Sequence, residues 1–345
     1  MRIGILTGGG DCPGLNPTIR GLVLAGIKKY HYEFLGFKDG WAGPIQNLTM
    51  PLDVATVREI QAEGGTLLGS SRTNPLKDQS LIEKIKDNLK ANKIDVLVVM
   101  GGDDTLGVAT KLAEMGINTI GVPKTIDNDL NATDTTFGFD TAVSIATEAV
   151  DRLHTTARSH HRTLVVEVMG RHAGWIALYT GIAGGADYTM IPERDTDLKE
   201  LCAIVQGEYG EGRKNYAIVV VSEGAKLAKM DHLVLQDQSH DAFGHVKLGG
   251  IGKMVAKAIE KETGIETRDV ILGHTQRGGT PTAFDRVLST RYGIFTADMI
   301  NDEKYGYMVG LAGRKLVAVP LSAATDETKI VDSDWFPILE IMRAN

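Results

Sequence analysis

Two short segments of the sequence place acidic side chains directly after short apolar runs. The first, GGDDT at residues 101–105, follows the apolar run Ile94 to Met100. Two carboxylates at the end of a buried strand, Asp103 and Asp104, are costly unless a positive charge lies beside them. Mg²⁺ bound through one carboxylate and substrate phosphates would meet that need. Capping of the next helix would explain one of these acids but does not readily explain both.

The second segment, PKTIDND at residues 123–129, joins a lysine, a hydroxyl and acids within a few positions. Lys124 can neutralise charge on a transferring phosphoryl group, and Asp127 can accept a proton from an attacking hydroxyl. Asp and Asn are also common turn formers, so an acidic turn without catalytic function stays open for this loop alone. Together, the two segments predict a Mg²⁺-dependent phosphoryl-transfer site.

Three further loops combine glycine with groups that bind phosphate. Residues 8–14, GGGDCPG, carry three successive glycines whose N–H groups can point together and hold phosphate oxygens at a helix start. This loop matches neither the dinucleotide fingerprint nor the phosphate-binding lysine loop, and alone it is equally consistent with a structural turn. Residues 169–175, MGRHAGW, and 272–279, LGHTQRGG, each set an arginine beside glycines, which suits phosphate binding.

The elements that must position these loops are short buried strands alternating with amphipathic helices. Leu81, Ile82, Ile85 and Leu89 recur at helical spacing before one of the apolar runs. The predicted strands cover Arg2 to Leu6, Ile94 to Met100, Asn118 to Val122, Leu164 to Met169 and Tyr216 to Ser222. Helices between such strands imply βαβ units and a parallel α/β sheet. Ligands of such sheets bind at the carboxyl ends of the strands, where polar and glycine-rich loops follow.

Composition narrows the classes of function. A chain of 345 residues suggests two domains, and 43% hydrophobic residues suffice for a sizeable core. A net charge of -7 disfavours nucleic acid as a partner, and without an 18-residue apolar run no membrane span is expected. The first residues are interrupted too early by glycine for a signal peptide.

Cys12 and Cys202 are expected as free thiols in a reducing cytoplasm. His154, His160 and His161 match no familiar metal-binding spacing and are expected as solvated or interface side chains.

The chain resembles the phosphofructokinase family over nearly its whole length. LTGGGDCPGLN, GGDDT, PKTIDND, GFDTA, MGRHAGW, PERD, SEGA and LGHTQRGGTPTAFDR occur in the family's order. The resemblance implies two Rossmann-like three-layer α/β domains with mainly parallel sheets and an active site in the cleft between them. The expected division is 1–138 with about 275–322 for the phosphoryl donor and Mg²⁺, and 139–274 with about 323–345 for fructose 6-phosphate. The implied reaction is transfer of a phosphoryl group to the 1-hydroxyl of fructose 6-phosphate, a step of glycolysis.

The resemblance also implies roles for individual residues. Asp103 matches the Mg²⁺ ligand, Asp127 the general base, and Arg171 the arginine that bridges the transferring group. The donor side comprises Gly9, Gly10, Arg72, Gly102 and Thr105. The sugar-phosphate side comprises Thr125, Ile126, Asp127, Asp129, Met169, Gly170, Arg171, Glu223, His274 and Arg277. In the family Arg162 and Arg268 reach the 6-phosphate from a neighbouring subunit, so their presence implies a homodimer or homotetramer.

Two departures from the family's ATP-dependent pattern indicate the donor. That pattern has glycine at the positions of Asp104 and Lys124, and here both carry charge. A carboxylate at 104 would fill the space of an α-phosphate and repel it. Lys124 could supply positive charge to inorganic diphosphate, although some ATP-dependent members also carry this lysine. Asp104 therefore carries the prediction of diphosphate as donor in a reversible reaction, with an ATP-dependent enzyme as the alternative.

Two other classes are less well supported. A nicotinamide-dependent oxidoreductase would share the α/β fold, but the glycine fingerprint is missing. A non-catalytic sugar-phosphate sensor would be expected to lose Asp103 or Asp127, and both are present.

Overall fold

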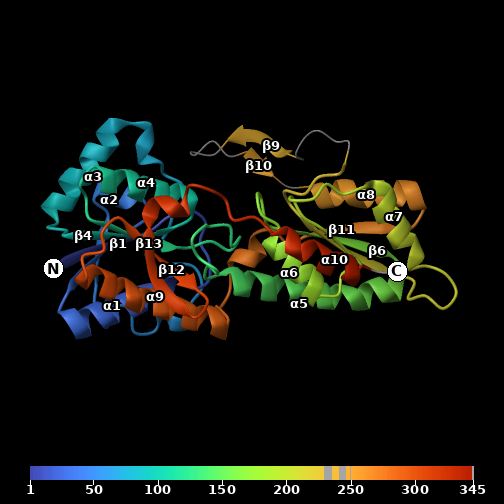
Figure 1. The fold of residues 1–345 in the computed structure, drawn as a ribbon, viewed down its shortest axis with the longest axis horizontal. Coiled ribbons are helices and arrows are strands. Elements are labelled where there is room, and N and C mark those ends of the chain that lie inside the picture. Colours follow the sequence, from blue (N-terminus) through green and yellow to red (C-terminus); the bar gives the residue numbers. More distant parts are fainter. Residues whose placement is uncertain (229–234, 241–245, 249, 344–345) are drawn as a thin grey trace.

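A computed structural model of the chain describes residues 1–228, 235–240, 246–248 and 250–343. Two sheets, one of seven strands and one of four, lie end to end along the longest axis, and each is covered by helices on both faces (Figure 1). Two Rossmann-like three-layer units with mainly parallel sheets were expected from the sequence, and the structure confirms them. In the part of the chain that the structure describes, no helix is long and apolar enough to cross a membrane.

The larger sheet has the strand order β13-β12-β5-β4-β1-β2-β3. Its strands are β1 (Arg2–Thr7), β2 (Glu33–Phe37), β3 (Thr49–Leu52), β4 (Val96–Gly101), β5 (Thr119–Pro123), β12 (Tyr307–Ala312) and β13 (Lys315–Pro320). The five central strands pair in parallel, and antiparallel β3 and β13 form the edges. Every residue of β4 and β5 is buried, as the apolar runs predicted for strands covered on both faces.

The smaller sheet is entirely parallel, with the order β11-β6-β8-β7. Its strands are β6 (Thr163–Val168), β7 (Tyr188–Met190), β8 (Ala217–Ser222) and β11 (Thr267–Ile271). Two short strands, β9 (Leu235–His240) and β10 (Val246–Leu248), pair with each other outside both sheets.

Helices cover each sheet on two sides (Figure 1). Beside the larger sheet lie α1 (Leu15–Tyr30), α2 (Ala42–Gln46), α3 (Gln79–Ala91), α4 (Asp103–Glu114) and α9 (Ala283–Asn301). Beside the smaller sheet lie α5 (Phe139–His160), α6 (Trp175–Ala183), α7 (Leu198–Gly207), α8 (Ile251–Thr263) and α10 (Phe336–Met342). Ile82, Ile85 and Leu89 form the buried face of α3, as their spacing predicted.

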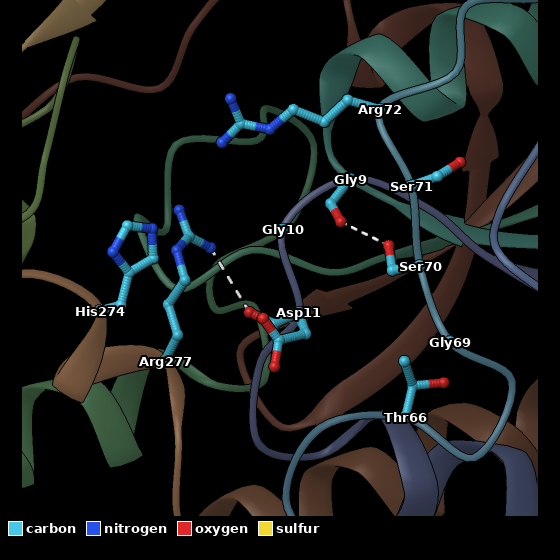
Figure 2. Close-up of a pocket in the computed structure, with 10 residues that line it drawn as sticks. All are labelled: Gly9, Gly10, Asp11, Thr66, Gly69, Ser70, Ser71, Arg72, His274 and Arg277. Atoms are coloured by element: carbon cyan, nitrogen blue, oxygen red, sulfur yellow. Dashed lines mark hydrogen bonds between the residues drawn. The ribbon is translucent and has the colours of Figure 1, made fainter.

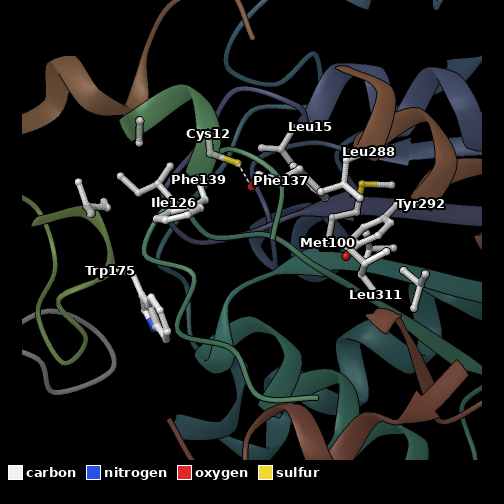
Figure 3. Close-up of a cluster of buried hydrophobic side chains, with 14 of the residues drawn as sticks. Cys12, Leu15, Met100, Ile126, Phe137, Phe139, Trp175, Leu288, Tyr292 and Leu311 are labelled. Carbon is white, nitrogen blue, oxygen red and sulfur yellow. Dashed lines mark hydrogen bonds between the residues drawn. The ribbon is translucent and has the colours of Figure 1, made fainter. Parts of the chain in front are cut away.

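The apolar core is continuous between the two units. One cluster joins Leu15, Met100 and Tyr292 of the first unit to Phe139 and Trp175 at the start of helices of the second (Figure 3). This shared core fixes the two sheets relative to each other, because displaced apolar contacts would expose surface to water. The strand ends of both sheets are therefore held in a defined relation.

The chain crosses between the units near the predicted boundary. The segment FGFD leads into α5, which begins at Phe139. Residues of α10 contact α6 and β7, so this C-terminal helix lies beside the smaller sheet. We therefore propose the domain division given above, 1–138 with about 275–322 and 139–274 with about 323–345.

The cysteines and histidines have mainly structural surroundings. Cys12 and Cys202 are buried free thiols, as predicted. His154 contacts the Gly184 carbonyl oxygen through Nε2 at 2.7 Å, while His160 and His161 are exposed at the end of α5.

Candidate active site

Three of the predicted loops meet at one edge of the larger sheet. Strands β1, β4 and β5 are neighbours and parallel, with Thr7 opposite Met100 and Gly101 opposite Pro123. The Gly8 N–H donates to the Met100 carbonyl at 2.9 Å, and the Lys124 N–H donates to the Gly101 carbonyl at 2.9 Å. The loops at residues 8–14, 101–105 and 123–129 therefore lie side by side, as parallel strands require.

Close packing explains why glycine begins the GGDDT segment. A Cβ at Gly101 would lie 2.3 Å from the Cβ of Thr105, and Thr105 is only 2% exposed. The side chain of Thr105, predicted to bind the donor, packs against this glycine and lies beside Gly8 and Gly9 of the glycine loop. The chain then enters α4 at once, with Asp103 and Asp104 in its first turn, where the helix dipole favours acids.

The glycine loop differs in one respect from the prediction. The N–H of Gly8 is bonded to Met100, and the N–H of Gly9 donates to the Ser71 carbonyl at 3.2 Å. Two of the three N–H groups expected to hold phosphate are thus used within the protein, and that part of the prediction is wrong. The reason is the segment before Arg72, since the Ser70 hydroxyl also donates to the Gly9 carbonyl. These bonds attach the glycine loop to Ser70 and Ser71, which directly precede Arg72 in the sequence.

A cavity of about 460 Å³ opens at this place (Figure 2). Its walls include Arg72 from the first unit and His274 and Arg277 from the short helix η3 (Gly273–Arg277). Arg277 donates to the Asp11 carbonyl at 3.4 Å, and a Cβ on Gly10 would lie 2.4 Å from its Nη1. The cavity thus combines predicted donor residues with two residues predicted for the sugar phosphate. Its lining is completed by Gly9, Gly10 and, not assigned from the sequence, Asp11, Thr66, Gly69, Ser70 and Ser71.

The unassigned residues carried a weak signal in the sequence. Asp11 follows the three glycines, and Ser70 and Ser71 stand directly before Arg72. Their proximity to predicted residues could have suggested them. Thr66 and Gly69 belong to no motif, and their place follows from the turn that leads into Ser70.

Loops of the smaller sheet meet in the same way at its carboxyl edge. The Ser222 hydroxyl donates to the Gly170 carbonyl at 2.6 Å, which joins the loops after β8 and β6. The Met169 N–H donates to Gln276 Oε1 at 3.3 Å, which joins the loop after β6 to η3. Met169, Gly170, Arg171 and Glu223, the residues that the family resemblance assigned to the sugar-phosphate side, therefore lie together at the carboxyl ends of β6 and β8.

Four carboxylates influence one another across the two units. Burial, reinforced by the negative charges of Asp127 and Asp103, raises the pKa of Asp129 to about 7. Burial and the charge of Asp127 also raise the pKa of Glu223 to about 7, while Arg171 opposes this shift. Asp127 thus acts on one group from each unit, and the strand ends of both sheets share one electrostatic site.

Asp127 has a free acceptor atom. Its Oδ1 is buried and has no hydrogen-bond partner among the residues that the structure describes. Its backbone N–H donates to the Thr125 hydroxyl at 3.1 Å. A buried carboxylate oxygen without a donor is costly, and it is available to accept a proton from a bound hydroxyl.

Lys124 reaches from the second loop into the glycine loop. It is 3% exposed, and its ammonium donates to the Gly10 carbonyl. Burial lowers the pKa of Lys124, and the nearby Arg277 lowers it further, while Asp11 and Asp127 oppose the shift. The amine of Lys124 therefore lies between the loop of Gly9 and Gly10 and the loop of Asp127, where burial disfavours its charge and a bound anion would favour it.

The acids at the larger sheet suit a magnesium ion that completes its shell with substrate. Among the described residues, no group of three or more His, Cys, Asp or Glu side chains could hold a metal alone. Asp103 is exposed, and its Oδ1 accepts the N–H of Asp104 at 2.8 Å. Mg²⁺ commonly takes one or two carboxylates and fills the remaining positions with water and phosphate oxygens. The residues present fit such an ion.

Three predicted residues lie elsewhere. The Ile126 side chain is fully buried in the apolar cluster, so only its backbone could contact a substrate (Figure 3). Arg162 and Arg268 lie at the amino ends of β6 and β11 and both pair with Glu266, at 3.2 and 2.8 Å. A six-residue strand of about 20 Å separates that end from Arg171. The two arginines are therefore not brought to the site of their own chain.

Comparison with known proteins agrees with this architecture. The model of the family described as Phosphofructokinase matches residues 2–300. A curated relative from Streptomyces coelicolor, named pyrophosphate–fructose 6-phosphate 1-phosphotransferase, is 58% identical over 334 residues, 96% of each chain. A relative from Mycobacterium leprae, named ATP-dependent 6-phosphofructokinase, is 47% identical over 333 residues, again 96% of each.

A solved structure gives the same result. Phosphofructokinase from Pichia pastoris in the T-state aligns with a TM-score of 0.83 and 30% identity over 99% of this chain. This chain spans 36% of the length of that one. The ordered motifs at the strand ends, the two sheets and these matches show that the chain belongs to the phosphofructokinase family.

Proposed function

We propose that this protein transfers a phosphoryl group, reversibly, from inorganic diphosphate to the 1-hydroxyl of fructose 6-phosphate. The products are fructose 1,6-bisphosphate and phosphate. The name of the Streptomyces coelicolor relative, at 58% identity, supports both substrates. The two free thiols are in keeping with a reducing cytoplasm as the place of this glycolytic step.

The observation that carries the choice of donor is the pair of charges at the donor loops. The buried side chain of Lys124 donates to the Gly10 carbonyl, and Asp104 stands in the first turn of α4, which follows the strand paired with β1. A compact diphosphate gains from the ammonium, whereas the α-phosphate of a nucleotide would meet the Asp104 carboxylate. Like charges brought together cost several kcal/mol, which suffices to decide between donors.

The roles of the remaining residues follow from their positions. Arg72, with Gly9, Gly10, Gly102 and Thr105 shaping the loops, would hold the leaving phosphate. Asp127 would take the proton of the attacking hydroxyl, because its buried Oδ1 has no hydrogen-bond donor among the residues that the structure describes. Lys124 and Arg171 would stabilise charge on the transferring group. The sugar phosphate would be held by Thr125, the Ile126 backbone, Asp129, Met169, Gly170, Glu223, His274 and Arg277.

Asp103, with Asp129 near it, would hold magnesium. The ion would offset charge on the diphosphate oxygens, which the acidic site itself cannot do. The surrounding residues would then orient the donor against the sugar hydroxyl.

An ATP-dependent reaction is the second candidate. The 47% identity to a relative named ATP-dependent 6-phosphofructokinase favours it, since nearly the whole chain aligns. The carboxylate of Asp104 argues against it for the reason given above.

A second copy of the chain would complete the site. Arg162 and Arg268 lie together on one surface, away from Arg171 and bonded to Glu266. Such a pair suits the 6-phosphate bound by a neighbouring subunit, in a homodimer or homotetramer.

Phosphorus NMR of a reaction with fructose 6-phosphate, diphosphate and Mg²⁺ tests this proposal. Diphosphate should disappear while phosphate and fructose 1,6-bisphosphate form in equal amounts. Starting from those two products should regenerate diphosphate. Absence of bisphosphate in the forward reaction would contradict the proposal.

A further inference from the structure

A short C-terminal segment, Thr328 to Val331, lies between the two units and contacts both. Thr328 bridges Leu130 in antiparallel fashion, and the Lys329 N–H donates to the Asp129 carbonyl at 2.8 Å. On the other side, the Val331 N–H donates to Glu193 Oε1 at 2.9 Å. The segment thus joins the loop that carries Asp127 and Asp129 to the smaller sheet.

The Lys329 side chain binds the same loop, residues 128–134, which follows β5 of the larger sheet. Its ammonium donates to Asn128 Oδ1 at 3.0 Å, to the Thr133 carbonyl at 2.8 Å and to the Asp134 carbonyl at 3.0 Å. A lysine ammonium has three N–H donors, and three acceptors surround this one. The bonds close residues 128–134 into a compact loop.

The backbone of Asn128 is in the left-handed region, with a φ of 54°. Asn adopts this region more readily than most residues with a side chain, and here its side-chain bonds help to fix the turn. Its Oδ1 also accepts the Thr136 N–H at 3.0 Å, so one amide oxygen links both ends of the loop. Asp127 and Asp129 flank Asn128, and the direction of both carboxylates depends on this turn.

The same lysine contacts the loop that follows β6. Its carbonyl accepts the indole N–H of Trp175 at 3.0 Å, and its ammonium lies 5.9 Å from the centre of that ring. Glu193 Oε1 accepts the N–H of Gly174 at 2.9 Å as well as that of Val331. The arginine loop MGRHAGW is therefore held by the segment that holds Asn128.

Burial of the Lys329 ammonium costs free energy, and an apolar side chain could fill the same space without that cost. Burial lowers the pKa of Lys329 to about 8, although the negative charges of Asp129 and Asp134 oppose the shift. An apolar side chain of similar length would avoid this cost but could not bind three oxygens. The gain lies in the defined shape of the loop.

We propose that Lys329 is a positioning residue that fixes the turn of Asp127, Asn128 and Asp129 relative to Arg171. This inference rests on the proposed function, because Asp127 and Arg171 belong to the proposed phosphoryl-transfer site. Lys329 does not line the donor cavity. Its loss should therefore disturb the geometry of transfer more than the binding of diphosphate.

Two variants of Lys329 test the proposal: Lys329→Met removes the ammonium and keeps a similar length, and Lys329→Arg keeps a cation with several N–H donors. Lys28→Met, at an exposed lysine of α1, is the control. We expect Lys329→Met to lower kcat by about 10–100-fold, since misplacement of reacting groups has effects of this size. The KM for diphosphate should stay near that of the wild type. Lys329→Arg should recover most of kcat, and Lys28→Met should change neither.

Hydrogen exchange gives a readout that does not depend on turnover. In Lys329→Met, peptides that cover residues 125–136 should exchange faster, while peptides from β4 and β6 keep their protection. Unchanged kcat in an active enzyme, or unchanged exchange of residues 125–136, would overturn the inference. Faster exchange over the whole chain, or no recovery by Lys329→Arg, would show a general structural role and would also overturn it.

The two proposals can fail separately. If the wild type forms no fructose 1,6-bisphosphate, the proposed function fails, and the exchange of residues 125–136 still decides whether Lys329 holds the loop. If the wild type is active and Lys329→Met is equally active, the proposed function stands and the role of Lys329 is wrong.

Discussion

Asp127 has a buried carboxylate oxygen, Oδ1, that receives no hydrogen bond from the described part of the chain. Replacing it by Asn keeps the shape and removes the proton acceptor. We expect kcat to fall by about 10²–10⁴, the usual contribution of a general base. Steady-state kinetics with saturating substrates measures this, with Asp151→Asn, an exposed acid of α5, as the control. A kcat close to that of the wild type would remove Asp127 from the mechanism.

Glu223 can be tested through the pH dependence of the protein's stability. Burial and the charge of Asp127 raise its pKa from 4.5 to about 7. Between these values the unfolded chain loses the proton before the folded protein does. The contribution of this group to stability is therefore complete below pH 4.5 and is lost as the pH rises through 7.

Glu223→Gln removes that titration. The variant and the wild type should unfold at similar temperatures near pH 4.5, and at pH 8 the variant should be more stable. The upper bound is about 3.5 kcal/mol, since the pKa rises from 4.5 to about 7 and one pKa unit corresponds to about 1.4 kcal/mol. The KM for fructose 6-phosphate should rise, because a charged acceptor is lost. Thermal unfolding at both pH values measures the first effect, and a constant difference between the two proteins would contradict it.

At the scale of elements, the packing of β4 against the start of α4 can be tested with two glycines. A Cβ at Gly101 would lie 2.3 Å from the Cβ of Thr105, whereas one at Gly107 in α4 would meet nothing within 4 Å. Gly101→Ala should destabilise the protein by about 1–3 kcal/mol through overpacking. Gly107→Ala should stabilise it by up to about 1 kcal/mol through helix propensity. Denaturant unfolding checks both, and equal shifts in the same direction would contradict this packing.

The elements also show what the sequence could predict. The apolar run Ile94 to Met100 predicted β4, although the strand begins at Val96 because Ile94 still bonds to the end of α3. Parallel order then implied that the loops after β1, β4 and β5 meet. These steps need only periodicity and topology, and they place most of the candidate site.

Other features depend on contacts that no local pattern reveals. The N–H of Gly9 is occupied because Ser71, 62 positions later, offers its carbonyl. The Lys329 ammonium binds the backbone carbonyl groups of Thr133 and Asp134. Every residue type has such a carbonyl, so the sequence gives no sign of these contacts. Burial of Ile126 follows from apolar packing between the units. Such partners become known only once the two units are assembled.

For the whole molecule, the surface pair Arg162 and Arg268 predicts a second subunit. Arg162→Ala should raise the KM for fructose 6-phosphate by about 10–100-fold, because a charge-assisted hydrogen bond contributes about 1.5–3 kcal/mol. Arg152→Ala, an exposed arginine paired with Glu148 on α5, is the control. An unchanged KM, or a monomer in sedimentation experiments at assay concentration, would contradict a shared site.

The net charge of -7 makes local placement of cations decisive for a molecule that binds anions. Arg72, His274 and Arg277 converge on one cavity (Figure 2). The Lys124 side chain donates to the carbonyl of Gly10, which lines that cavity. Substrate binding should therefore weaken with salt less steeply than for a protein with an extended basic surface, since Lys124 is buried and Arg277 is half-buried.

The ratio of kcat/KM for diphosphate to kcat/KM for ATP decides which phosphoryl donor the protein uses. The rates are measured at fixed fructose 6-phosphate and Mg²⁺ for the wild type and for Asp104→Gly. We predict a ratio above about 100 for the wild type, because repulsion of several kcal/mol opposes the nucleotide. The ratio should fall in Asp104→Gly as ATP is admitted. A wild type that prefers ATP would show that diphosphate is not its main phosphoryl donor.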